Sequence, residues 1–237
     1  MSTKIDYYFS RLDKFPFEGW FDGLTETYEI LIKAKSFLKE LLVERDVKEN
    51  HGIIKGDAPN LHGNYYIGEG TVIYNDVTII GPVYIGKNCE ILPGAIIRPN
   101  TILSDGCSVG HGSEVKHCVC FGGSKVASLS FCGDSVLGAS ARIGSGVITA
   151  NRRFDQQNAK LRVNGEVTDL RDSFFGLILG DSARLGANSV TQPGTHIGPY
   201  SWVYPITNVR GFVPADQHVY HPREIVMKDA PRVELKP

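Results

Sequence analysis

Basic residues at a regular spacing are the first sign of chemistry in this sequence. Arg98 and Lys116 lie eighteen residues apart, and Glu114 stands close to the second of them. If the chain coils with that period, the two cations stack on one face, where like charges repel unless something neutralises them. Glu114 is the simplest counter-charge, and a phosphate bound by both cations is the alternative. A cluster of further cations in a chain of balanced charge favours the phosphate: Lys125, Arg142, Arg152 and Arg153.

The elements that must position these cations appear as a six-residue rhythm. Apolar residues recur at every sixth position from Leu61 to Ala127, and the rhythm returns at Leu137 and at Leu179. Neither an α-helix nor an alternating strand repeats in this way, whereas hexapeptide β-solenoids do. Three hexapeptides form one triangular coil, so residues one coil apart stack at about 4.8 Å. The rhythm predicts a mainly-β protein, a parallel β-helix over roughly residues 58–213 whose marker residues all point into the core.

Two segments interrupt the rhythm, at residues 123–136 and 151–176. Loops on a rigid scaffold carry function more often than the scaffold itself. We therefore expect both as loops inserted into a β-helix domain that spans residues 53–213. The second contains "KLRVNGEV", in which Asn164-Gly165 predicts a β-hairpin with a type I′ turn.

The two ends of the chain lack the rhythm. Residues 24–44 have apolar residues at helical spacing, with Thr25 or Thr27 as the N-cap. With the aromatic-rich turn before it, this helix predicts a helical cap over residues 1–52 that covers the strand edges at the end of the coils. Residues 214–237 contain several prolines and predict an extended C-terminal arm.

Composition restricts the partners. A chain of 237 residues with 42% hydrophobic content can bury a full core, and a net charge of −1 favours neither nucleic acid nor an anionic membrane. No apolar run approaches a transmembrane span, and the N-terminus has no signal-peptide layout. The five cysteines form no paired framework. They indicate a reducing, cytoplasmic location, with Cys89 and Cys107 as small interior residues of successive coils and not a disulfide.

The segment "IRPNTILSDGCSVGHGSEVKHCVCFGGSKVASLSFCGDSVLGASARIGSGVITANRRFD" resembles a known family. It is similar to the acetyltransferase half of bifunctional sugar-1-phosphate nucleotidylyltransferases, the N-acetylglucosamine-1-phosphate uridylyltransferase/glucosamine-1-phosphate acetyltransferases, with "TANRRFD" closest to the archaeal-type branch. The resemblance implies that the β-helix is left-handed, that the protein is a homotrimer, and that acetyl-CoA binds as co-substrate in clefts between adjacent solenoids. The residues before the β-helix are too few for a nucleotidylyltransferase domain, so we expect that activity in a separate partner protein.

The resemblance also assigns roles to single residues. Arg98 and Lys116 fall on the basic residues that bind the sugar phosphate, and Asn151 on an asparagine of the sugar pocket. Ser145 and Ala187 fall where small side chains line the coenzyme groove. Arg152, in the basic cluster beside Asn151, completes the expected substrate-binding residues on this side.

Three positions depart from the family pattern. Ser128 stands where the family has its general-base histidine, Phe131 where it has a tyrosine, and Arg142 where it has an asparagine that assists the chemistry. Phe131 and Arg142 are still expected to bind the substrate. A serine hydroxyl cannot replace imidazole as a base near neutral pH. His111, and after it His117, are therefore the alternative bases.

Two functions from different classes remain open. One is acetyl-CoA-dependent N-acetylation of an amino-sugar phosphate or sugar nucleotide, and the other is a non-catalytic trimer that binds such a ligand or a partner enzyme. A metal lyase is a third candidate function, because γ-class carbonic anhydrases share the expected fold and bind zinc through three histidines. His111 and His117 are separated by five residues, but no third ligand matches, so we expect no metal.

Overall fold

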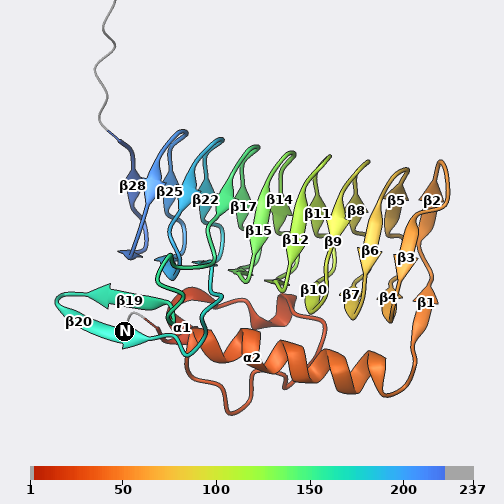
Figure 1. Ribbon diagram of the computed structural model, residues 1–237, viewed down its shortest axis with the longest axis horizontal. Helices are drawn as coiled ribbons and strands as arrows, with labels where there is room; N and C mark the ends of the chain where they lie inside the picture. The colour runs from red at the N-terminus through yellow and green to blue at the C-terminus, as the bar shows by residue number, and fades with distance from the viewer. Residues whose placement is uncertain (1–2, 222–237) are drawn as a thin grey trace, which may run out of the picture.

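The computed structural model describes residues 3–221, most of which form a left-handed parallel β-helix with three flat faces (Figure 1). Each coil contributes one short strand to each of three parallel sheets, here named I, II and III. Sheet I contains, in spatial order, β1 (Lys48–Asn50), β4 (Tyr65–Ile67), β7 (Val83–Ile85), β10 (Thr101–Leu103), β13 (Val119–Cys120), β16 (Val136–Leu137), β21 (Leu177–Leu179), β24 (Thr195–Ile197) and β27 (Phe212–Val213).

Sheet II contains β2 (Ile53–Lys55), β5 (Val72–Tyr74), β8 (Glu90–Ile91), β11 (Ser108–Val109), β14 (Lys125–Val126), β17 (Arg142–Ile143), β22 (Arg184–Leu185), β25 (Trp202–Val203) and β28 (His218–Val219). Sheet III contains β3 (Asn60–His62), β6 (Thr78–Ile80), β9 (Ile96–Ile97), β12 (Glu114–Lys116), β15 (Phe131–Gly133), β18 (Ile148–Thr149), β23 (Val190–Thr191) and β26 (Asn208–Val209). The coils thus begin at residue 48 and continue to residue 219, earlier and later than the expected bounds.

The expected loop at residues 123–136 is absent, because these residues continue the coils and contain β14 and β15. Two successive coils are one residue shorter than the eighteen-residue coil before them: Ile85 pairs with Leu103, but Leu103 pairs with Cys120, and Cys120 with Leu137. The shortened corners lie at His117 and Asp134, single residues in the left-handed conformation with φ of 48° and 47°. Two short steps change the phase of the rhythm without any inserted loop.

The shortened corners also correct two predicted marker residues. Phe121 and Ala127 do not point into the prism core, where Cys120 and Val126 take their places. Phe121 is fully buried on the outside of sheet I, against aromatic residues of the N-terminal segment. The preceding nine markers from Ile67 to Val115 line the core as predicted.

The N-terminal segment lies along the side of the β-helix and does not cap its end (Figure 1). It contains α1 (Ile5–Tyr8), the 3₁₀-helix η1 (Leu12–Lys14), α2 (Thr27–Leu38) and the π-helical turn η2 (Lys39–Val43). The residue that caps α2 is Glu26, not a threonine, and it forms a capping box with Glu29. The outer face of sheet I explains this placement, because its residues are apolar and need cover: Ile102, Val119, Val136 and Ile178.

Specific polar contacts fasten the same segment to distant coils. Buried Asp181 accepts hydrogen bonds from the backbone N–H groups of Ser10, Arg11 and Ala139 at 2.9, 3.1 and 2.8 Å. His196, fully buried on the outer face of sheet I, donates from Nδ1 to the Gly194 carbonyl at 3.0 Å. Its Nε2 accepts from the Thr27 hydroxyl at 2.9 Å.

The second predicted insertion, after β18, is present. It carries the antiparallel hairpin β19 (Lys160–Val163) and β20 (Glu166–Asp169). Asn164 and Gly165 both have positive φ, as a type I′ turn requires. At the C-terminal end, the first residues of the expected arm form β28, and the rest of that arm lies outside the described residues. No helix in residues 3–221 is long and apolar enough to cross a membrane.

Candidate functional site

Four of the predicted site residues stack in one line along the corner between sheets II and III. Each coil turns this corner directly after a strand of sheet II, and backbone hydrogen bonds join the successive turns. Leu129 N–H donates to the His111 carbonyl at 2.8 Å, Gly146 N–H to the Ser128 carbonyl at 3.0 Å, and Asn188 N–H to the Ser145 carbonyl at 2.8 Å. We call this line the corner column: His111, Ser128, Ser145 and Ala187.

His111 is the group in the corner column that can accept a proton. Its Nδ1 lies 2.7 Å from the Pro93 carbonyl, which can only accept, so Nδ1 carries the hydrogen. Nε2 is then the ring nitrogen with a lone pair, and the side chain is exposed. Ser128 occupies the next turn of the column. An imidazole held by a carbonyl in this tautomer has the arrangement that a general base requires.

The predicted phosphate-binding pair lies on the outer face of sheet III. The register of β9 and β12 places Arg98 beside Lys116. Both cations have carboxylate partners: Arg98 contacts Glu114 at 2.5 Å, and Lys116 contacts Asp134 at 3.2 Å. Glu114 is the counter-charge expected from the sequence, whereas Asp134 was not anticipated.

Asp134 is the centre of a polar cluster beside this pair. The carboxylate is buried, and it also accepts from His117 Nδ1 at 2.9 Å and from the Asn151 amide at 2.5 Å. His117 uses its other nitrogen to bind the Leu31 carbonyl at 3.1 Å. With both ring nitrogens engaged, His117 links the β-helix to α2 and is not a candidate base. In residues 3–221 no three His, Cys, Asp or Glu side chains are grouped to hold a metal ion.

The insertion after β18 adds an aromatic residue that the sequence analysis missed. The Phe174 ring centroid lies 4.6 Å from Lys116 Nζ and 4.5 Å from the Arg152 guanidinium carbon. Arg152 also bridges to Phe174 through the backbone. Cations over an aromatic face are attracted by its quadrupole. Phe174 therefore holds two of the predicted substrate-binding cations together, a role that no sequence spacing reveals.

Phe131 and Arg142 lie on different faces. Phe131 is on the outer face of sheet III, in register between Glu114 and Ile148. Gly133 leaves room for it, because a Cβ there would lie 2.6 Å from the Phe131 ring and 2.9 Å from the Asn151 amide. Arg142 is on the outer face of sheet II, so the structure separates it from the other predicted substrate-binding residues.

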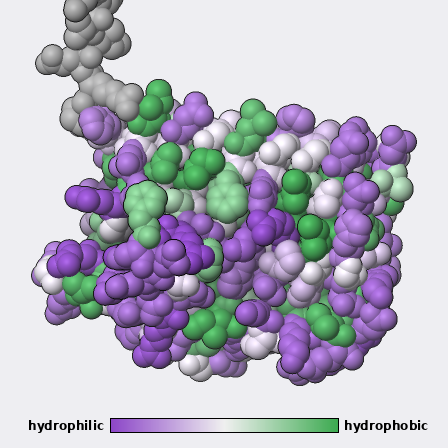
Figure 2. Space-filling model, viewed as in Figure 1, coloured by the Kyte–Doolittle hydropathy of each residue, from purple (hydrophilic) through white to green (hydrophobic). Residues whose placement is uncertain are grey.

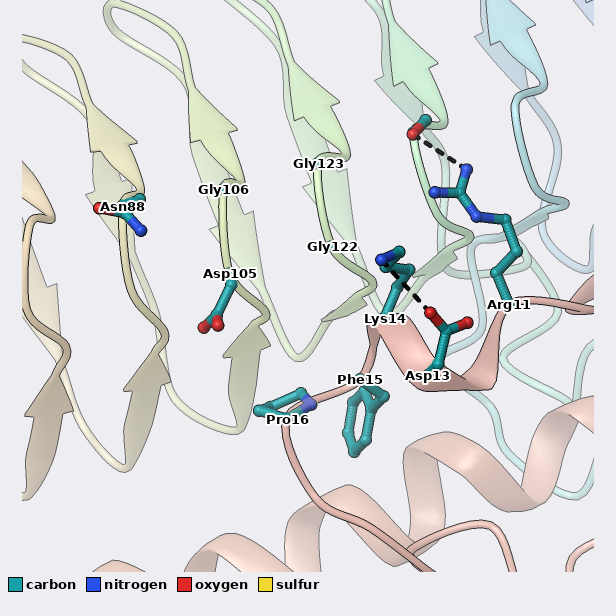
Figure 3. Close-up of a pocket in the computed structure, with 11 residues that line it drawn as sticks. Arg11, Asp13, Lys14, Phe15, Pro16, Asn88, Asp105, Gly106, Gly122 and Gly123 are labelled. Atoms are coloured by element: carbon teal, nitrogen blue, oxygen red, sulfur yellow. Dashed lines mark hydrogen bonds and ion pairs between the residues drawn. The ribbon is translucent and has the colours of Figure 1, made fainter.

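A cavity of about 500 Å³ lies at a different corner, between sheets I and II (Figure 3). The N-terminal segment forms one wall, where Arg11 donates to the Ser140 hydroxyl at 3.4 Å and Lys14 contacts Asp13 at 3.3 Å. Coil corners that include Gly106 form the other wall. None of the predicted site residues lines this cavity, so it is separate from the corner column.

Comparisons with known proteins agree on a family. Residues 79–190 match the family model described as the GMPPB C-terminal domain. The bifunctional sugar-1-phosphate nucleotidylyltransferase/acetyltransferase of Sulfurisphaera tokodaii is 34% identical over 195 residues, 82% of this chain and 47% of that protein. The putative uncharacterized acetyltransferase YaiX of Escherichia coli is 31% identical over 173 residues, 73% of this chain and 74% of that protein.

Among solved structures, the UDP-N-acetylglucosamine acyltransferase of Francisella novicida overlaps with a TM-score of 0.39 and 17% identity, over 69% of this chain and 60% of that one. The chain spans about half the length of the bifunctional relatives it matches. By its sequence matches and its fold, the chain belongs to the family of hexapeptide-repeat acetyltransferase domains of bifunctional sugar-1-phosphate nucleotidylyltransferase/acetyltransferases.

Proposed function

We propose that this protein transfers an acetyl group from acetyl-CoA to the amine of an amino-sugar phosphate or sugar nucleotide, with His111 as the general base. The observation that carries the proposal is the corner column, in which the tautomer of His111 is set by the Pro93 carbonyl and its Nε2 is left to accept a proton. Ser128, at the family's usual base position, stands one turn away.

The chemistry needs one base at this place. His111 Nε2 accepts a proton from the acceptor amine as the amine nitrogen attacks the thioester carbonyl of acetyl-CoA. The carbon–sulfur bond then breaks, the coenzyme sulfur leaves with the electron pair, and the imidazolium returns the proton to it. The products are the N-acetyl sugar and free coenzyme A thiol.

Sheet III supplies the charge for a sugar phosphate. Arg98, Lys116 and Arg152 are three cations, and Glu114 and Asp134 are the two carboxylates that face them. One positive charge remains, because the hydrogen-bond partner of the Arg152 side chain is the neutral Gln156 amide, at 3.0 Å. A phosphate binds such a cluster through charge-assisted hydrogen bonds, most strongly to the arginine forks.

We further propose that the active unit is a homotrimer, with the coenzyme held between the corner column of one subunit and the next subunit. Figure 2 shows apolar side chains on the face that sheet III presents. Ile80, Ile96 and Ile148 are exposed there, and Leu129 is exposed at the corner itself. An apolar surface of this kind supports subunit contact beside the column.

The test is thiol release from acetyl-CoA in the presence of glucosamine-1-phosphate. His111→Gln should lower kcat by about 10²–10⁴-fold, the usual contribution of a positioned base. Ser128→Ala should stay within a few-fold of the parent, and His62→Gln, an exposed histidine elsewhere on sheet III, is the matched control. Unchanged turnover by His111→Gln would refute the assignment.

A second function is favoured by one observation, the serine at position 128. A non-catalytic trimer that binds a sugar phosphate or a partner enzyme keeps the basic cluster and needs no base. Binding of both acetyl-CoA and glucosamine-1-phosphate without thiol release would support it over acetyl transfer.

A further inference from the structure

The outer face of sheet II carries three cations on adjacent strands. Lys125 pairs in register with Arg142, and Arg142 with Arg184. The next residue of each strand, respectively Val126, Ile143 and Leu185, points into the core, so the three cations point outward, and all three are exposed. Neighbouring strands lie about 4.8 Å apart. We call this line the cation column.

Among the described residues, the cation column has no ion-pair partner. Within residues 3–221, none of its three members makes a salt bridge, in contrast to Arg98 and Lys116 on sheet III. Like charges directly opposite each other on adjacent strands are destabilising. A column of three uncompensated cations is therefore a surface that an extended anion would stabilise.

Aromatic rings continue the same line. Arg184 pairs in register with Trp202, and Trp202 with His218. The rings of Trp202 and His218 stack with centroids 5.1 Å apart and planes 9° apart, and Trp202 is 46% exposed. The strands that carry His218 and Arg184 lie on opposite sides of β25. The second face of the indole is thus turned toward the cation column, and it makes no cation–π contact with any described residue on that side.

Small residues separate the cation column from the corner column. Ala127, Gly144 and Gly186 each stand two residues after a cation. A Cβ at Gly144 would lie 2.7 Å from the Ala187 nitrogen, and one at Gly186 would lie 2.4 Å from the Pro205 nitrogen, so these positions require glycine. At Gly144 and Gly186 the strip beside the cations therefore carries no side chain.

We propose that this face of sheet II binds a nucleotide with two or more phosphates, whose phosphates contact Lys125, Arg142 and Arg184 and whose base stacks on Trp202. Arginine forks and a lysine are the side chains that hold phosphate oxygens. An exposed indole is a platform for any nucleobase. The order along the column, three cations followed by an aromatic ring, matches the order of phosphates and base in a nucleotide.

Two sources share this chemistry: the adenosine diphosphate portion of acyl-CoA and the nucleoside diphosphate of a nucleotide sugar. Nucleotide binding itself requires no acetyl transfer. Only the identity of the natural ligand, acyl-CoA or nucleotide sugar, rests on the proposed function. Competition distinguishes the sources. Coenzyme A displaces bound ADP if the site holds the acyl donor, and a UDP-sugar displaces bound UDP if it holds the acceptor.

The experiment is calorimetric titration of the full chain with ADP, UDP and inorganic pyrophosphate. We expect at least one nucleotide to bind, with an affinity that falls as ionic strength rises. Lys125→Gln, Arg142→Gln and Arg184→Gln should each raise the Kd roughly tenfold, the effect of losing one charge-assisted contact. Trp202→Ala should weaken nucleotide binding by about fivefold or more and leave pyrophosphate binding unchanged. Arg162→Gln, which removes an exposed cation from the hairpin, is the matched control.

Folding does not confound these variants. Arg142→Gln removes the middle of three like charges, so its melting temperature should equal or exceed that of the parent. Absence of binding by both nucleotides, or unchanged affinity in Arg142→Gln and Arg184→Gln, overturns the proposal. Unchanged nucleotide affinity in Trp202→Ala overturns the base platform. If nucleotides bind but the protein releases no thiol from acetyl-CoA, acetyl transfer is refuted and the nucleotide site is supported.

Discussion

His196 should make this protein sensitive to acid. Its ring is fully buried, stacked on Phe175 at 5.8 Å and edge-on to Tyr8 at 5.5 Å. Burial lowers its pKa from the ordinary 6.5 to about 4, although the hydrogen bond to the Gly194 carbonyl opposes the shift. The folded protein therefore holds this imidazole neutral at pH values where the unfolded chain protonates it.

The sign and size follow from linkage. The stability associated with neutral His196 is fully present above pH 6.5 and is lost as the pH falls toward 4. At about 1.4 kcal/mol per pKa unit, the total loss is about 3 kcal/mol. A glutamine at this position cannot be protonated. His196→Gln should be less stable than the parent at pH 7.5, by about 1–3 kcal/mol for lost hydrogen bonds and packing, but its stability should decline less on acidification.

The assay is urea unfolding at pH 7.5 and pH 4.5, at one protein concentration, followed by the fluorescence of buried Trp20 in the N-terminal segment. Other titrating groups change both proteins alike, so the difference between the two curves isolates His196. We expect the gap between parent and variant to shrink by about 2–3 kcal/mol between the two pH values. A gap that stays constant would show that His196 does not titrate in this range, and would refute the argument from burial.

Four further predictions concern substitutions of single residues. Phe121→Ala should destabilise the protein by about 3–5 kcal/mol and release the N-terminal segment to limited proteolysis, because the ring stacks on Phe9 and Phe21; equal protease resistance would contradict it. Gly186→Ala should lower the melting temperature, since the new methyl meets the next coil at 2.4 Å. Asp134→Asn should cost about 3 kcal/mol in urea unfolding by leaving Lys116 without its carboxylate. Arg98→Gln should abolish the thermal protection given by glucosamine-1-phosphate, and protection equal to that of the parent would show the pair to be only a solvated face.

The architecture was predictable because one physical rule, burial of every sixth residue, operates along most of the chain. The prediction of core residues failed where a residue at the sixth position is apolar and buried for another reason. Counting in sixes arrives at Phe121, which is apolar and buried, but it is buried under the N-terminal segment and not in the prism. At the His117 corner, successive core residues are five and not six positions apart. The sequence shows this only through the shifted spacing of the apolar residues that follow.

The sites show the same limit. Arg98 and Lys116 were found because their coil has the standard length. The pairing of Lys125 with Arg142 was missed because their coil is one residue shorter, and that of Arg142 with Arg184 because the hairpin insertion lies between them. Asp134 and Phe174 join the basic cluster through a corner and an insertion, whose three-dimensional course no repeat length encodes.

The N-terminal segment changes the character of the whole β-helix. In a plain solenoid each coil touches only its neighbours, so stability adds coil by coil and the ends can unwind while the middle persists. Here residues near the start of the chain hold late coils: Thr27 binds His196, the backbone of Ser10 binds Asp181, and the Tyr7 hydroxyl accepts from Ala215 N–H at 2.9 Å. Unwinding the last coils must first break contacts that span most of the sequence. The N-terminal segment thus couples early and late parts of the chain. We therefore expect the protein to unfold as one cooperative unit and to fold slowly, because long loops must close first.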